Sequence, residues 1–312
     1  MELSPDLRAL RDFYYKTALK LPPERDFVRG EKVIDKPAFF TLEHLRRHLN
    51  NPLLTPDFFK LYWQGKPVDC SRAMGHKVVQ AADLPFLNKG IIEEYLANGA
   101  AIVLEAVDLF EPMVNAMCAA IDNAGEVLLS NSVAFFSQAR GGEAYRGHVD
   151  TADVLVVQLA GRKKWYLHRR QNPRWVNLNE LDPAAMGPVQ AEFVMQPGDA
   201  IYLRNYTPHR VETADEYSLH MAFDICDRRL NADTALHLLL QTYNQDAAPI
   251  YTPVEGVLEK LKSHADSKPY RDHLAQLSQA QAENYKRARA LFGANKVTAL
   301  DKLVAAEAAR RK

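Results

Sequence analysis

The sequence has few cysteines, no excess of either charge and no long apolar run, and each shortage narrows the class of protein. Its three cysteines, Cys70, Cys118 and Cys226, are scattered and lack Cys-x-x-Cys spacing, so neither a disulfide framework nor a zinc knuckle is indicated. The 39 Lys and Arg residues balance the 39 Asp and Glu residues, which argues against non-specific nucleic-acid binding. We therefore expect no direct nucleic-acid partner.

No stretch approaches membrane-spanning length, and the N-terminus lacks the basic and apolar regions of a signal peptide. These absences favour a cytoplasmic protein that has no membrane partner. The 312 residues, of which 47% are hydrophobic, can form one large domain with accessory parts.

Two histidines and one aspartate form the most informative pattern that is present. His148 and Asp150 are two residues apart, so on a strand their side chains share one face. His209 follows from a distant segment, after Thr207-Pro208. Two imidazoles and one carboxylate make the facial triad that holds non-haem Fe(II) and leaves coordination positions open for a co-substrate and O2. The pattern predicts an oxygenase in which these three residues bind the metal.

A His-x-Asp tripeptide alone is a weak signal, because ten histidines make it common by chance. In the alternative interpretation, His148 ends a strand, Asp150 starts a turn and His209 is an ordinary histidine. The context favours the metal site. Segments 153–159 and 162–168 are typical of strands joined by a turn at Ala160-Gly161, and strands over 192–195 and 200–204 flank a Pro-Gly-Asp turn. This pattern predicts a jelly roll with the metal inside its mouth.

Residues from about 91 to 227 resemble the JmjC/cupin Fe(II)- and 2-oxoglutarate-dependent oxygenases, most closely the ribosomal-oxygenase branch. The resemblance implies an α+β fold with a double-stranded β-helix core, and hydroxylation of a side chain with Fe(II), 2-oxoglutarate and O2. The matching segments, in order, are Asn98–Leu104, His148–Asp150, Gln158–Trp165, Pro197–Leu203, Pro208–His209 and Ser218–His220.

The resemblance also implies residues that hold the co-substrate. Lys163 falls where the family places the basic residue that pairs with the distal carboxylate of 2-oxoglutarate, and a dicarboxylate entering a dry pocket needs such a cation. Arg162 and Lys164 are the competitors, but strand alternation points both to the opposite face. Thr213 corresponds to a hydroxyl that helps to hold the co-substrate, and is equally typical of ordinary strand filling. Asn131 corresponds to a family asparagine, although Val133 stands where the family has a tyrosine.

Helices are expected on both sides of this core. The N-terminal region, residues 1–86, has capping signals at Ser4 and Thr41, and the catalytic domain spans 87–228. Residues 229–312 carry three apolar stripes of helical period, the first following Asp233 and the last ending at Gly293. The resemblance suggests a homodimer through these C-terminal helices. Packing against the chain's own barrel is the equal alternative.

Substrate identity is not encoded in any motif. A side chain in a protein or peptide fits the resemblance best, and a free amino acid or small molecule is the alternative. A non-catalytic metal-binding cupin and a metal-dependent isomerase are further hypotheses; an intact set of three ligands plus Lys163 favours the oxygenase. Residues 140–146 and 204–206 are expected near the mouth, either contacting substrate or serving as loops.

Overall fold

The computed structural model describes residues 3–51, 54–124, 128–138, 147–169, 186–227 and 254–294, together with residues 239, 306, 309 and 310. The chain divides into two compact units, Met1–Cys226 and Asp227–Lys312. The predicted helix after Asp233 and the predicted mouth segment 140–146 lie outside the described residues, apart from Leu239 in the first of them. The predicted boundary at residue 86 stays a prediction.

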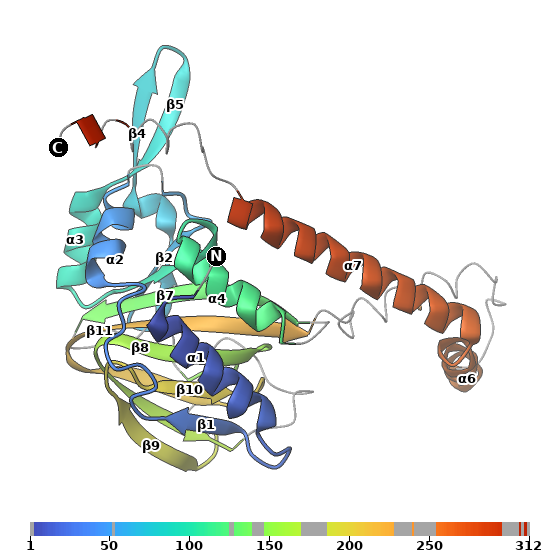
Figure 1. The fold of residues 1–312 in the computed structure, drawn as a ribbon. Helices are drawn as coiled ribbons and strands as arrows, with labels where there is room; N and C mark the ends of the chain where they lie inside the picture. Colours follow the sequence, from blue (N-terminus) through green and yellow to red (C-terminus); the bar gives the residue numbers. More distant parts are fainter. Residues whose placement is uncertain are drawn as a thin grey trace. The chain divides into compact units, whose positions relative to one another are not determined.

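Within the described residues, nine strands of the first unit form one large sheet in the order β1-β10-β8-β11-β7-β6-β2-β3, with β9 paired to β8 (Figure 1). Strands β1, β2 and β3 come from the N-terminal region, so that region contributes directly to the sheet. The strands are β1 (Phe27–Gly30), β2 (Phe59–Trp63), β3 (Lys66–Val68), β6 (Ala101–Leu104), β7 (Leu128–Gln138), β8 (Asp153–His168), β9 (Val189–Met195), β10 (Ala200–Leu203) and β11 (His209–Asp227).

The long strands β8 and β11 each serve two layers. The first half of β8 pairs with β10 and with the C-terminal half of β11, whereas its second half pairs with β9 and with the start of β11. The predicted turn at Ala160-Gly161 is wrong, because β8 continues through it and only bends. Gly161 has a φ of +62°, and a Cβ there would overlap the backbone oxygen of Tyr217. Opposite this bend, the register of β11 shifts between Thr213 and Ser218.

The two layers face each other across an interior cavity, which gives the jelly-roll core that the sequence predicts. Alternate residues of each strand point inward. On β7, Val133, Phe135 and Ser137 line the cavity, whereas Ala134 joins the apolar core that the N-terminal helices cover. The fold class is therefore confirmed, with the metal motif of residues 148–150 adjoining the start of β11.

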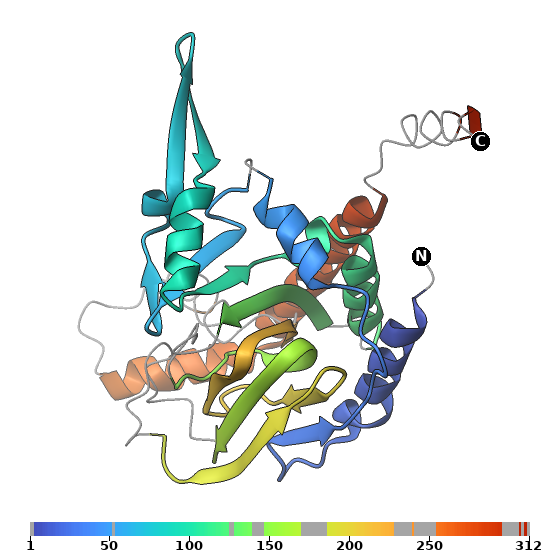
Figure 2. The same ribbon diagram turned by 90° about the vertical axis from the view of Figure 1, so that its left-hand side faces the viewer.

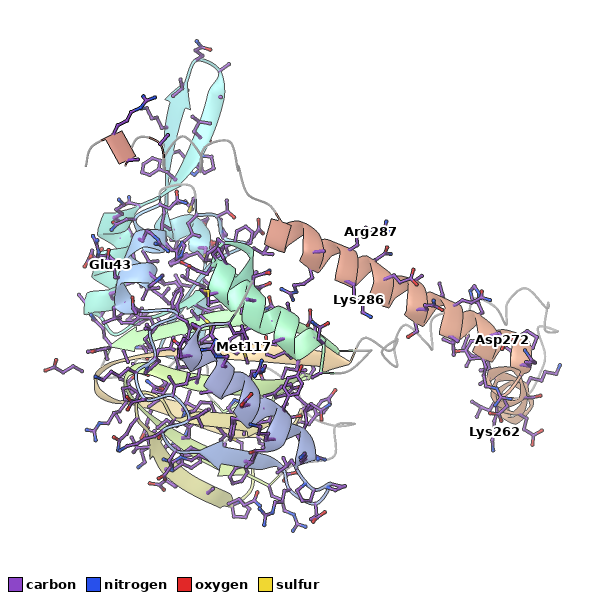
Figure 3. The ribbon with its side chains drawn as sticks, in the orientation of Figure 1. Glu43, Met117, Lys262, Asp272, Lys286 and Arg287 are labelled. Carbon is purple, nitrogen blue, oxygen red and sulfur yellow. The ribbon has the colours of Figure 1, made fainter. Side chains whose placement is uncertain are left out.

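Helices of the first unit cover the other face of this sheet. α1 (Pro5–Lys16) and α4 (Pro112–Asp122) lie side by side in Figure 1, and the Tyr15 hydroxyl of α1 donates to the Ala120 carbonyl of α4 at 2.7 Å. The side chain of Met117 on α4, labelled in Figure 3, is fully buried. The other helical segments are α2 (Leu42–Leu49), α3 (Lys89–Ala97) and the short 3₁₀ helices η1 (Ala18–Lys20), η2 (Cys70–Ala73) and η3 (Val107–Leu109).

The two predicted helix caps have different outcomes. Thr41 caps α2 as expected, in a reciprocal arrangement with His44. Ser4 precedes α1, but its hydroxyl donates to the Asp6 carboxylate instead of accepting a backbone N–H. The Asp6 carboxylate itself accepts the N–H of Leu7 at 3.0 Å, so it provides a cap from within the helix.

A hairpin that the sequence pattern did not predict projects from the first unit. Its strands, β4 (Met74–Val79) and β5 (Ala82–Leu87), form a separate two-stranded sheet (Figures 1 and 2). Val78 is 72% exposed. Because most of the hairpin faces solvent, burial does not impose the apolar-polar alternation by which strands are recognised.

The second unit contains helices where two of the three apolar stripes predict them. α6 (Val254–Ala265) and α7 (Lys268–Ala294) carry exposed charged side chains, among them Lys262 and Asp272 in Figure 3. In the part of the chain that the structure describes, no helix is long and apolar enough to cross a membrane.

Candidate metal centre

Backbone pairing brings the distant histidines together. His148 and His209 form an isolated antiparallel bridge, in which the N–H of each donates to the carbonyl of the other at 3.0 and 2.9 Å. Asp150 follows on the same side, and its carbonyl accepts the N–H of Tyr206 at 2.7 Å. Strand geometry therefore converts a separation of about sixty residues in sequence into direct contact.

The three predicted ligands converge on one point. The Nε2 atom of His148 lies 3.7 Å from Asp150 Oδ1, and the Nε2 atom of His209 lies 3.6 Å from Asp150 Oδ2. One ligand atom from each residue can be chosen so that all lie within 4.8 Å of one another. Two imidazoles and one carboxylate in this arrangement can hold one divalent metal ion and leave further positions open.

The environment of His209 keeps it ready to bind a metal. Its Nδ1–H donates to the Thr207 carbonyl at 2.9 Å, which directs Nε2 toward Asp150. Burial and the neighbouring His148 lower the pKa of His209 to about 4, so the ring is neutral near pH 7. The indole of Trp165 stacks on this ring at 5.7 Å between centroids. Only a neutral imidazole offers a metal its nitrogen lone pair.

The metal cluster forms one part of the wall of the interior cavity, which has a volume of about 230 Å³. A cavity of about 150 Å³ accommodates benzene, so this one has room for a five-carbon dicarboxylate. Its walls are mostly apolar, with Val154, Val156 and Val211 among them. The Asp150 side chain is 35% exposed and the His209 side chain only 6%, so the site opens on the aspartate side.

Lys163 lies in the same cavity, where a free ammonium group would be strongly disfavoured. It is 2% exposed, and its Nζ donates to Ser137 Oγ at 2.8 Å and to Thr213 Oγ1 at 3.3 Å. These two hydroxyls are themselves 2.7 Å apart. Thr213 thus supports Lys163 across the β8–β11 ladder without forming part of the cavity wall itself.

The competing cations point away, as strand alternation requires. Arg162 is exposed, and Lys164 forms a 2.7 Å ion pair with Glu192 on β9. Arg204 also turns away from the mouth, because its guanidinium donates to the Leu21 carbonyl at 2.7 Å. Lys163 is therefore the cation of these four that faces the cavity.

The structure does not place Asn131 with these residues. Asn131 lies on β7, but the described residues that line the cavity include Val133, Phe135 and Ser137 of this strand and not Asn131. Its predicted role in holding the co-substrate therefore has no structural support.

Sequence reasoning missed four polar residues that line the cavity, namely Ser137, His220, Asp224 and Glu105. Ser137 is on the inward face of β7, which alternation from Phe135 could have revealed. His220 belongs to a segment that carried the family resemblance, but no role was assigned to it. Asp224 also lines the cavity, and burial together with Asp150 and Glu105 raises its pKa to about 7.

Residues 109–232, which make up less than half of the chain, match the JmjC domain family. Together with the relatives and solved structures below, this match confirms the predicted resemblance to JmjC oxygenases of the ribosomal-oxygenase branch.

Individual relatives agree with this class. The chain is 18% identical over 235 residues to Bifunctional lysine-specific demethylase and histidyl-hydroxylase NO66 of Drosophila mojavensis, which covers 62% of this chain and 26% of that protein. It is 29% identical over 83 residues to Ribosomal oxygenase 2 of Rattus norvegicus, covering 26% of this chain and 18% of that protein. The chain thus spans about a quarter or less of the length of these curated relatives.

Solved structures share the fold. YcfD of Escherichia coli superposes with a TM-score of 0.54 at 14% identity, over 86% of this chain and 70% of that one. A structure of YcfD, a ribosomal oxygenase, in complex with cobalt and 2-oxoglutarate gives a TM-score of 0.53 at 13% identity, over 83% of this chain and 69% of that one.

Proposed function

We propose that this chain is an Fe(II)- and 2-oxoglutarate-dependent oxygenase that hydroxylates a side chain of a protein or peptide. The observation that carries the proposal is one cavity with a His-Asp-His cluster in one part of its wall and the buried Lys163 in another. A purely structural metal site has no use for a cation placed to receive a dicarboxylate.

The donor set fits the metal and the cavity fits the co-substrate. His148, Asp150 and His209 would hold Fe(II), since imidazole and carboxylate ligands suit this ion. Lys163 would pair with the distal carboxylate of 2-oxoglutarate, with Ser137 and Thr213 holding its ammonium group in position. The relative YcfD has been crystallised with cobalt and 2-oxoglutarate, which supports the same pairing here.

Fe(II) held by these residues would supply oxidative decarboxylation of 2-oxoglutarate to succinate and CO2, with one oxygen atom of O2 entering succinate and the other a C–H bond of the substrate. The chain's own residues orient and shield this chemistry. The apolar walls exclude water, and Trp165 and the Thr207 carbonyl fix the His209 ring. The side of the site where Asp150 is exposed admits the target side chain.

A macromolecular substrate is favoured over a free amino acid by the relatives' names. They are called ribosomal oxygenase and histidyl-hydroxylase, which describe action on proteins. A homodimer through the second unit remains a further expectation; its test is the mass of the full chain in solution.

The decisive experiment is an anaerobic titration of the Fe(II)-loaded protein with 2-oxoglutarate, following the visible metal-to-ligand charge-transfer band. Lys163→Ala should weaken 2-oxoglutarate binding about tenfold or more, because a charge-assisted hydrogen bond is lost. Lys164→Ala is the matched control, since that side chain pairs with Glu192 outside the cavity. Absence of the band from wild-type protein with bound iron would reject the oxygenase in favour of a binding cupin. Equal affinity in the Lys163 variant would reject the assigned anchor.

A further inference from the structure

A buried histidine in the co-substrate cavity has no role in the function proposed above. His220 is on the C-terminal half of β11, beyond the register shift, and lines the cavity from the layer opposite Lys163 and Trp165. It is 6% exposed. His220 is not one of the three clustered metal ligands, and it is not one of the two hydroxyl residues that accept from Lys163.

The ring of His220 is held in a fixed orientation by aromatic neighbours. Phe135 stacks on it at 4.8 Å between centroids with an interplanar angle of 10°, and Trp165 meets it edge-on at 6.3 Å. Its Nδ1 atom is enclosed and has no hydrogen-bond partner among the described residues. Buried polar groups are normally hydrogen-bonded. The nitrogen left to meet a cavity ligand is therefore Nε2.

His220 lies close to both groups that would hold the co-substrate, the metal cluster and Lys163. His220 contacts Trp165, and Trp165 also stacks on the metal ligand His209. Lys163 precedes Trp165 by two residues, on the same face of β8. Burial first, and then the positive charge of Lys163, lowers the pKa of His220, so the ring is neutral and carries a single N–H. A dicarboxylate that reaches from the metal to Lys163 passes this ring.

We infer that His220 is a co-substrate-binding residue, whose Nε2–H donates to the 2-oxoglutarate carboxylate that Lys163 also holds. This inference rests on the proposed function. The carboxylate selects the tautomer with the proton on Nε2, because the enclosed Nδ1 meets no acceptor. Lys163 then supplies charge, whereas His220 supplies direction from the opposite layer.

Two isosteric substitutions distinguish the ring nitrogens. The amide nitrogen of Gln can occupy the place of Nε2, whereas that of Asn corresponds to Nδ1. We would measure the Kd of 2-oxoglutarate by calorimetry on the full chain loaded with Mn(II), which is inert to turnover. His220→Asn should weaken binding about ten- to a hundredfold, and His220→Gln should restore most of the affinity. Val211→Ala is the control for altered packing of the cavity wall.

A second ligand tests which carboxylate is involved. 2-Oxobutyrate keeps the keto acid but lacks the distal carboxylate, so its affinity should be the same in wild type and both variants. The inference would be overturned if His220→Asn lowered the affinity for the two ligands equally, or if it left the affinity for 2-oxoglutarate unchanged. No binding of 2-oxoglutarate to wild type would instead reject the proposed function itself.

A measurement on wild-type protein keeps the inference testable if the variants fail to fold. Histidine ¹⁵N NMR of the Zn(II)-loaded chain should show the Nε2 resonance of His220 shift to the protonated, hydrogen-bonded form when 2-oxoglutarate is added. Resonances of His220 that do not change on ligand binding would overturn the role.

Discussion

The metal cluster and the Lys163 site lie in one cavity but are built in different ways. Main-chain hydrogen bonds between His148 and His209 assemble the metal cluster, and Asp150 remains partly exposed. At the Lys163 site, hydrogen bonds between side chains of β7, β8 and β11 hold a fully enclosed ammonium group. The fold at the metal cluster can therefore survive the loss of a metal-binding side chain. The arrangement at the Lys163 site stabilises a charge that would otherwise be expensive to bury.

This difference teaches where each site is vulnerable. A side-chain change at the metal cluster removes a ligand but leaves the backbone bridge, so binding is lost while the fold remains. Removal of the Ser137 or Thr213 hydroxyl at the Lys163 site alters the position of a charge without removing it. We expect large, selective effects at the first site and graded effects at the second.

The largest effect is expected from His209→Ala. Two ligands remain, and stoichiometric Fe(II) binding should be lost, while the unfolding temperature of the metal-free protein changes little. Anaerobic calorimetric titration with Fe(II) measures the metal binding, and thermal denaturation measures the unfolding temperature. His76→Ala, on the exposed hairpin, is the control. Tight equimolar binding by the His209 variant would exclude it from the ligand set.

A smaller effect concerns Asp224, a buried carboxyl group in the cavity wall. The pKa of Asp224 rises from 3.8 to about 7, so the folded metal-free protein retains a proton that the unfolded chain has lost. Its stabilising contribution is full below about pH 4 and disappears as the pH rises through 7, up to a few kcal/mol. Denaturant unfolding between pH 5 and 8 should show this loss in wild type and not in Asp224→Asn. A parallel decline in both proteins would contradict it.

The smallest effect is expected from Ser137→Ala. Lys163 keeps its charge and Thr213 but loses its 2.8 Å contact, so the 2-oxoglutarate Kd should rise about three- to tenfold. The same calorimetric titration measures it, and Ser71→Ala, outside the cavity, is the control. A loss as large as that of Lys163→Ala would show that the two sites do not differ in the way proposed.

Much of the metal cluster could be predicted from the sequence because its geometry is local. Residues that are two apart on a strand share a face, and this rule placed His148 and Asp150 together. The third ligand, His209, was recognised in a Pro-His segment at the start of a later strand. The inward direction of Lys163 followed from the same alternation. Strands β9 and β10 followed from the Pro-Gly-Asp turn between them, and helices α1 and α2 from the capping signals at Ser4 and Thr41.

The rest depends on contacts that no local pattern encodes. His220 reaches the cavity through the pairing and register shifts of distant strands, which a single sequence does not fix. The bend at Gly161 was mistaken for a turn because glycine serves both. Asn131 was carried over by resemblance; it shares a face of β7 with Val133, Phe135 and Ser137 but lies farther along the strand, outside the residues that line the cavity.

The backbone bridge between His148 and His209 has a thermodynamic consequence. Since folding alone sets the separation of these two ligands, an arriving ion has little chain entropy left to remove, and the site is preorganised. A rigid pair of imidazoles accepts several first-row metals with affinities that follow their intrinsic order, in which iron ranks low. The metal that the protein carries is then decided by supply in its surroundings more than by selection at the site.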